Sequence, residues 1–171
     1  MSNDNKLSPN CIAMLALANE YCRTLEQAPQ MEKNQFIDTV LRLLPRVYIS
    51  ADDMTRGLAD QGFVAESFLD EDSYNAVRNG IAQLMGPDDT FLEVFVDDMK
   101  YSDEPIGASV SENLADIYQA LFNAVEGARN ATNDVIAGSL AACAQDFADY
   151  WGQTLCNVLR VLHYTKHNYS Y

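Results

Sequence analysis

Basic residues are scarce in this sequence. Its 171 residues include 11 lysines and arginines against 25 aspartates and glutamates, which gives a formal net charge of −14. Nucleic acids and anionic bilayers bind proteins through clustered lysine and arginine, so we expect neither as a partner. Of the 25 acids, 16 lie in residues 52–116 together with only three bases. A solubilising face explains this concentration most simply, and a site for a cation or a basic protein is the alternative.

Long apolar runs are also absent. The first ten residues, MSNDNKLSPN, lack the basic segment followed by an apolar stretch that marks a signal peptide, and no window approaches 18 uninterrupted apolar residues. We therefore expect a cytoplasmic protein that makes no contact with a membrane. Because 48% of the residues are hydrophobic, a folded core is expected. The length predicts one domain over residues 1–171, with frayed ends at 1–8 and 167–171.

The four cysteines lack a CxxC pair and a neighbouring histidine cluster. Cys11 and Cys22 fall in one predicted helix, where a rise of about 1.5 Å per residue separates them by about 16 Å, far beyond disulfide reach. The same test excludes a bond between Cys143 and Cys156. We interpret all four as small buried apolar residues and expect no zinc site.

Motifs for catalysis and for phosphate binding are missing as well. The sequence contains no GxSxG, GxGxxG or GxxxxGK. His163 and His167 stand four residues apart, but the glutamate of an HExxH motif is absent, and so are the Glu-x-x-His pairs of di-metal bundles. We therefore expect no metal and no cofactor, and an enzyme is not favoured.

What the sequence does contain is helical periodicity. Ser8 followed by Pro9 is typical of a helix start, and apolar residues then recur at spacings of three and four until Pro29. A second pattern covers residues 32–49. Pro45 interrupts it, and we expect a bend or a break there because proline removes one helical hydrogen bond.

The middle of the chain is less regular. Residues 51–70 are polar and predict a long loop. A third helix is predicted from the acids at Asp70 to a C-terminal cap at Gly86. Residues 90–96, TFLEVFV, favour a strand by composition, but no second strand-like run is visible to pair with them. We therefore expect a helix or an irregular packed segment here.

Two further helices complete the pattern. Ser109 and Glu112 match a capping box, and an apolar stripe at helical spacing follows from Val110 to Leu121. The longest helix is predicted over residues 134–166. It carries a row of small residues, Ala144, Ala148, Gly152 and Cys156, which predicts close approach of another helix. The fold class that follows is an all-α, single-domain irregular bundle of five to six helices, in which these last two helices are antiparallel neighbours.

Several short motifs resemble those of an uncharacterised bacterial family. In order, they are Phe91-x-Glu93-Val94-Phe95, Asp103-Glu104-Pro105-Ile106, Leu114-Ala115-Asp116-Ile117-Tyr118, Trp151-Gly152 and Leu159-Arg160-x-Leu162-His163. From about Cys11 to His163, the chain resembles the domain of unknown function 5063 family. It departs from the family pattern at Asn113-Leu114, where relatives often have a second acid, and around residues 52–68. The resemblance implies a helical, soluble bacterial protein and supplies no activity.

Six residues are our candidates for binding a ligand or a partner: Glu104, Asp116, Tyr118, Trp151, Arg160 and His163. A cation between Glu112 and Asp116 is one hypothesis. The simpler one is that Asp116 is solvated or pairs with Arg160. Tyr118 and Trp151 belong to an aromatic cluster that lines either a pocket or the core.

For the function, the sequence favours a non-enzymatic interaction or regulatory protein that presents an acidic surface to a protein partner. The alternative is an enzyme or small-ligand binder with one interhelical pocket, surrounded by Glu104, Asp116, Tyr118, Arg160 and His163.

Overall fold

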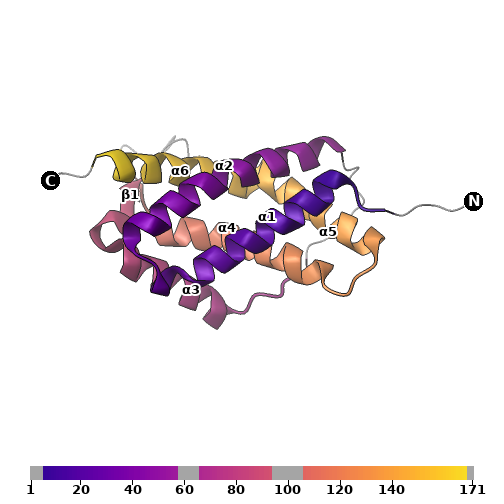
Figure 1. The fold of residues 1–171 in the computed structure, drawn as a ribbon, viewed down its shortest axis with the longest axis horizontal. Coiled ribbons are helices and arrows are strands. Elements are labelled where there is room, and N and C mark those ends of the chain that lie inside the picture. The colour runs from indigo at the N-terminus through magenta and orange to yellow at the C-terminus, as the bar shows by residue number, and fades with distance from the viewer. Residues whose placement is uncertain (1–5, 58–65, 94–105, 169–171) are drawn as a thin grey trace, which may run out of the picture.

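The computed structural model describes residues 6–57, 66–93 and 106–168. The α-helices of these ranges are α1 (Pro9–Glu26), α2 (Lys33–Gly57), α3 (Glu71–Met85), α4 (Val110–Ala128), α5 (Asn133–Asp146) and α6 (Gly152–His167). The predicted all-α irregular bundle with a long C-terminal helical stretch is confirmed (Figure 1). No helix within the described ranges is both long and apolar enough to cross a membrane.

Helix α4 occupies the centre of the bundle. It packs against α1, α3, α5 and α6. The predicted apolar stripe from Val110 to Leu121 is fully buried. The chain reverses direction after Ala128, so α5 and α6 run back antiparallel to α4, as expected (Figure 1). The other polar and charged residues of α4 must therefore reach solvent or partners through gaps between four neighbouring helices.

Four helix starts are capped by the side chain that precedes them. Ser8, Asp70, Ser109 and Thr132 each accept a hydrogen bond from the backbone N–H three residues further on. Such a cap stabilises a helix by about 1 kcal/mol. The starts predicted at Ser8, Asp70 and Ser109 are confirmed.

Helix α2 is longer than predicted. It runs unbroken through Pro45 to Gly57, so the break considered at Pro45 does not occur and a loop is the wrong prediction for residues 51–57. Pro45 is exposed, and water can satisfy the carbonyl that the proline leaves without a donor. Ala51 and Met54 are buried and continue the apolar side of the helix among polar neighbours. Residues 58–65 of the predicted loop lie outside the described ranges.

A short strand replaces the helix or irregular segment predicted after residue 90. Strand β1 (Thr90–Leu92) pairs antiparallel with β2 (Gly107–Ser109), with Phe91 opposite Ala108. The expectation was wrong because the partner sequence, Gly-Ala-Ser, carries no β-branched or aromatic residue and so gives no strand signal. Val94–Val96, the rest of the predicted segment, lie outside the described ranges.

The long C-terminal helix contains a π-helical turn, Phe147–Trp151, between α5 and α6. The Gly152 N–H bonds to the Phe147 carbonyl five residues back. A Cβ atom at Gly152 would lie 2.6 Å from that carbonyl oxygen and 2.9 Å from the Phe147 ring. Ala148 and Cys156 are exposed. The small residues therefore do not form one stripe under another helix, and Gly152 is required by the π turn itself.

We expect Gly152→Ala to destabilise the fold by about 1–3 kcal/mol, the usual cost of forcing extra atoms into a packed site. In an ordinary helix interior the same change stabilises by about 1 kcal/mol, so the sign is diagnostic. Urea denaturation measures it. Gly57→Ala is the control, because a Cβ there meets no atom within 4 Å. A Gly152→Ala protein as stable as the wild type would contradict this explanation of the π turn.

Candidate functional site

Asp116 connects α4 to two other elements through its carboxylate. It accepts a hydrogen bond of 2.6 Å from the Tyr74 hydroxyl on α3 and one of 3.2 Å from the Tyr150 hydroxyl on the π turn. Burial raises the pKa of the Tyr74 hydroxyl, and the Asp116 carboxylate that accepts its hydrogen bond raises this pKa further. The pairing of Asp116 with Arg160 is not observed. The Arg160 guanidinium instead donates to the Leu92 carbonyl at 3.0 Å.

The two aromatic candidates are structural. The Tyr118 hydroxyl donates to Glu26 Oε1 at 2.8 Å and ties α4 to α1. Trp151 is 1% exposed, and its indole N–H donates to the Cys143 carbonyl at 3.1 Å. These contacts hold the fold together, and Trp151 also lines a cavity with Asp116, so the structure brings these two candidates together.

The predicted five-residue pocket is not formed by its described members. Arg160 and His163 line a groove between α2 and α6, whereas Asp116 lines other cavities beside α4. Tyr118 is engaged at α1. Glu104 lies outside the described ranges. Sequence reasoning named residues from several elements without the geometry that decides which of them meet.

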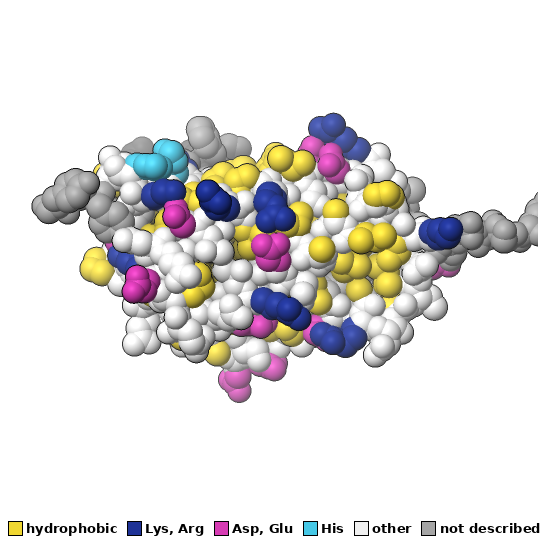
Figure 2. All heavy atoms as spheres, in the orientation of Figure 1, with side chains coloured by type: hydrophobic (Ala, Val, Ile, Leu, Met, Phe, Trp, Pro, Cys, Tyr) yellow, Lys and Arg dark blue, Asp and Glu magenta, His cyan; other side chains and the backbone are white. Residues whose placement is uncertain are grey.

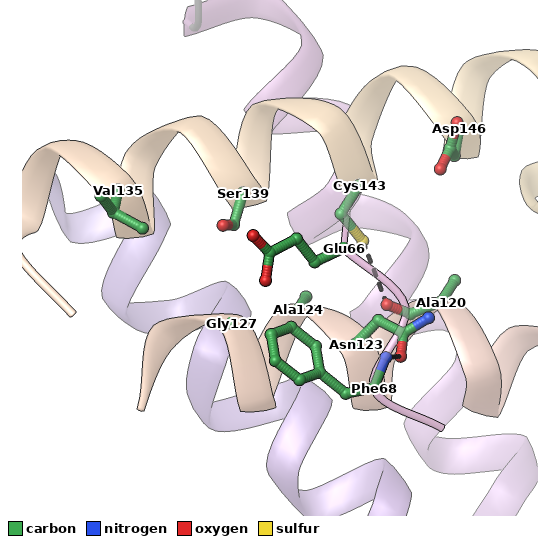
Figure 3. A pocket seen from close by; sticks show the side chains of 10 residues that line it. All are labelled: Glu66, Phe68, Ala120, Asn123, Ala124, Gly127, Val135, Ser139, Cys143 and Asp146. Atoms are coloured by element: carbon green, nitrogen blue, oxygen red, sulfur yellow. Dashed lines mark hydrogen bonds between the residues drawn. The ribbon is translucent and has the colours of Figure 1, made fainter. Parts of the chain in front are cut away.

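One cavity beside α4 lies between α4, α5 and the segment 66–69, with a volume of about 150 Å³ (Figure 3). Figure 3 shows the Glu66 carboxylate reaching into it beside Ser139. The Cys143 thiol faces the Ala120 carbonyl at 3.9 Å. Burial raises the pKa of this thiol to about 12, which disfavours its thiolate form.

Two larger cavities continue from this one along α4, with volumes of about 410 and 400 Å³. The first and second share Ala120, Asn123 and Asp146, and the second and third share Asp116 and Tyr150. We call the three together the acidic trough. Its carboxylates are Glu66, Glu93, Glu112, Asp116, Asp146 and Asp149.

The described lining of the trough contains no lysine, arginine or histidine. The π turn supplies Asp149 and Tyr150, and such turns are frequent at functional sites. Burial raises the pKa of the Asp146 carboxyl, and the nearby negative charge of Asp149 raises this pKa further. Nearby like charges that lack a counter-ion on the described protein favour a bound cation.

A buried amide also lines the trough. Asn113 is 7% exposed, and its Nδ2 finds no hydrogen-bond partner within the described ranges. Asn157, 6% exposed, lines the same cavity from α6. An unsatisfied buried donor costs about 1–3 kcal/mol, and it calls for an explanation in a native fold. A ligand that brings an acceptor oxygen to Asn113 would provide one.

The carboxylates are not arranged around a single point. The described part of the chain has no group of three or more histidine, cysteine, aspartate or glutamate side chains that could hold a metal ion. Glu112 and Asp116, proposed from the sequence to flank a cation, do line the same cavity. The six carboxylates are thus spread along the three cavities of the trough.

Sequence reasoning missed most of the trough. Glu66 and Glu93 lie on separate segments, and nothing in their spacing relates them to the C-terminal helix. Asp146, Asp149 and Tyr150 offered a signal, because at helical spacing they form a polar cluster on one side of the helix. That cluster predicts a polar surface on the helix, but it does not predict which other segments line the same cavity.

We expect Tyr74→Phe to destabilise the fold by about 1.5–3 kcal/mol, because its short bond to a carboxylate is part-buried. Tyr150→Phe removes a longer bond from a side chain that is 60% exposed, and we expect less than about 1 kcal/mol. Urea denaturation of both variants, and of each combined with Asp116→Asn, measures the coupling. Equal losses, or no coupling of Tyr74 with Asp116, would contradict this geometry.

Comparisons with known proteins identify a family and a solved structure of similar fold. Residues 5–168 match the family model described as Domain of unknown function (DUF5063). The crystal structure of protein BF1032 from Bacteroides fragilis is similar, with 29% sequence identity, a TM-score of 0.80, and coverage of 95% of this chain and 96% of that one. The comparison with curated proteins gave no match. The resemblance in the motifs is thus confirmed over nearly the whole length, and the chain belongs to the DUF5063 family.

Proposed function

We propose that the protein is a non-enzymatic binding module of the bacterial cytoplasm whose acidic trough receives a basic peptide segment of a partner protein. The observation that carries the proposal is the lining of the trough, with six carboxylates and no base among the described residues. An opposite charge about 4 Å away gains about 4 kcal/mol near a protein surface, before desolvation is subtracted. Several such contacts along one ligand give both affinity and orientation.

A peptide fits the trough better than a simple polyamine does. The Asn113 Nδ2 is a donor and needs an acceptor oxygen, which a peptide carbonyl supplies and a polyamine lacks. Gln153 and Thr154 on α6 add polar groups to the same cavity. The lysine or arginine side chains of the peptide would lie among the carboxylates while its backbone bonds to the amide.

Catalysis has less support. The Cys143 thiol is kept protonated by burial, and burial likewise raises the pKa of Tyr150. Of the residues in the alternative enzyme hypothesis, Asp116 lines different cavities from Arg160 and His163. Binding without chemistry therefore accounts for the geometry with fewer assumptions.

The trough is tested with a fluorescein-labelled tetrapeptide amide of alternating lysine and arginine, followed by fluorescence anisotropy. We expect the double variant Glu112→Gln/Asp149→Asn to weaken binding at least about tenfold, because both carboxylates line one cavity with Asn113. The affinity should also fall as salt is added, since part of it is Coulombic.

The matched control is Glu71→Gln/Asp72→Asn in the first turn of α3. It removes the same two charges from the net −14 but lies outside the described lining of the trough. We expect its affinity to stay within about twofold of the wild type. Equal weakening in both double variants would mean that the peptide responds to net charge alone, and the proposal would be wrong.

Asn113→Leu separates peptide binding from cation binding. We expect the variant to be more stable than the wild type by about 1 kcal/mol, because an apolar group replaces an unsatisfied buried donor. It should bind the tetrapeptide several-fold more weakly and bind spermine, which has no acceptor, unchanged. Urea denaturation and competition by spermine measure the two effects. A variant that is less stable, or that binds the peptide normally, would contradict the assigned role of Asn113.

A further inference from the structure

An open groove of opposite character lies between α2 and α6, with a volume of about 600 Å³. Its titratable lining residues are Asp38, Arg42, Cys156, Arg160, His163, Lys166 and His167. Figure 2 shows histidine side-chain atoms next to lysine and arginine side chains on the face where α1 and α2 lie. Three bases and both histidines of the chain thus face one groove, against a single acid.

The charges of the groove are only partly neutralised by the protein. Lys166 forms an ion pair with Asp38. The Nη2 group of Arg160 donates a hydrogen bond to the Leu92 carbonyl. The remaining N–H groups of the guanidinium are additional donors. Arg42 has no ion pair within the described ranges. Donors from two helices therefore converge on one groove, and Asp38, paired with Lys166, is the one acid of its described lining.

The two histidines add further donors to the groove. The rings of His163 and His167, one helical turn apart, have centroids 4.6 Å apart. An imidazole N–H donates in either protonation state, and an anion beside the pair offsets their repulsion when both are charged. Their spacing from the same helix face presents them together to one ligand group.

The rest of the groove is apolar. Leu41 and Pro45 from α2 face Leu159 and Cys156 from α6. A groove of this volume is in the range that accepts a small organic molecule, with apolar walls for its body and a few polar groups for its orientation. The lining thus fits a ligand that has an apolar part and an anionic end.

We propose that the groove between α2 and α6 binds a small organic phosphate, with its apolar part against Leu41, Pro45 and Leu159 and its phosphate among Arg42, Arg160 and the two histidines. Arginine forks match phosphate oxygens in geometry as well as in charge. The net charge of −14 does not prevent this, because charges beyond about 8 Å are largely screened at physiological ionic strength. The site is separate from the acidic trough and does not depend on its ligand.

Cys156 reports on the groove directly. It is the exposed cysteine of the four, and Cys11, Cys22 and Cys143 are buried. We expect N-ethylmaleimide, which is uncharged, to modify Cys156 first in the native full chain. Phenyl phosphate at constant ionic strength should slow this modification saturably, by about fivefold or more at high concentration. Mass spectrometry of the digested protein identifies the modified thiol and gives the rate.

Arg42→Ala tests the assignment, and Arg46→Ala is its matched control. Arg46 lies on the same helix, and its substitution removes the same charge. It pairs with Glu20, and both residues lie outside the described lining of the groove. We expect Arg42→Ala to weaken protection by phenyl phosphate about tenfold, with Arg46→Ala unchanged. The rate without ligand checks that each variant keeps its fold.

Phenol and benzylamine complete the design, because they keep the ring and remove or reverse the charge. Neither should protect Cys156 at concentrations where phenyl phosphate does. Three results would overturn the proposal: unchanged modification with phenyl phosphate, equal protection by benzylamine, or undiminished protection in Arg42→Ala.

Discussion

The enclosure of α4 by four helices is the constraint on which the rest of the structure depends. A polar group on an enclosed helix costs free energy unless a neighbour bonds to it, so each one fixes a neighbour in place. The Ser111 hydroxyl donates to Asp89 at 2.7 Å. The side-chain amide oxygen of Asn123 accepts hydrogen bonds from the backbone N–H groups of Phe68 and Leu69. Asp116 similarly holds α3 and the π turn, and the segments around α4 are positioned by its polar residues.

Asn113 departs from this rule, and the departure gives the acidic trough its chemical character. Its amide is as buried as its satisfied neighbours and yet lacks a partner in the described ranges. The surrounding carboxylates add negative charge without a described base to balance it. A site that is unsatisfied in both hydrogen bonding and charge is better suited to binding than to stability.

Local features of this fold were predictable and long-range ones were not. The caps at Ser8, Asp70 and Ser109 follow from chemistry within one turn, and the stripe on α4 follows from periodicity. Strand β1 was missed because its stability comes from a partner that lies beyond residues 94–105 and has no strand-like composition. The trough was only partly foreseen, through Glu112, Asp116 and Trp151, because its other carboxylates converge from segments that no spacing rule connects.

The two proposed sites have opposite charge, and the acidic trough is the central claim. Its most direct test is the nuclear magnetic resonance spectrum of ¹⁵N-labelled protein during titration with the basic tetrapeptide. The Asn113 side-chain amide and the backbone amides of Glu112, Asp149 and Gln153 should shift together and saturate at one peptide per chain. Shifts confined to surfaces outside the trough, or an Asn113 amide that does not respond, would contradict the claim.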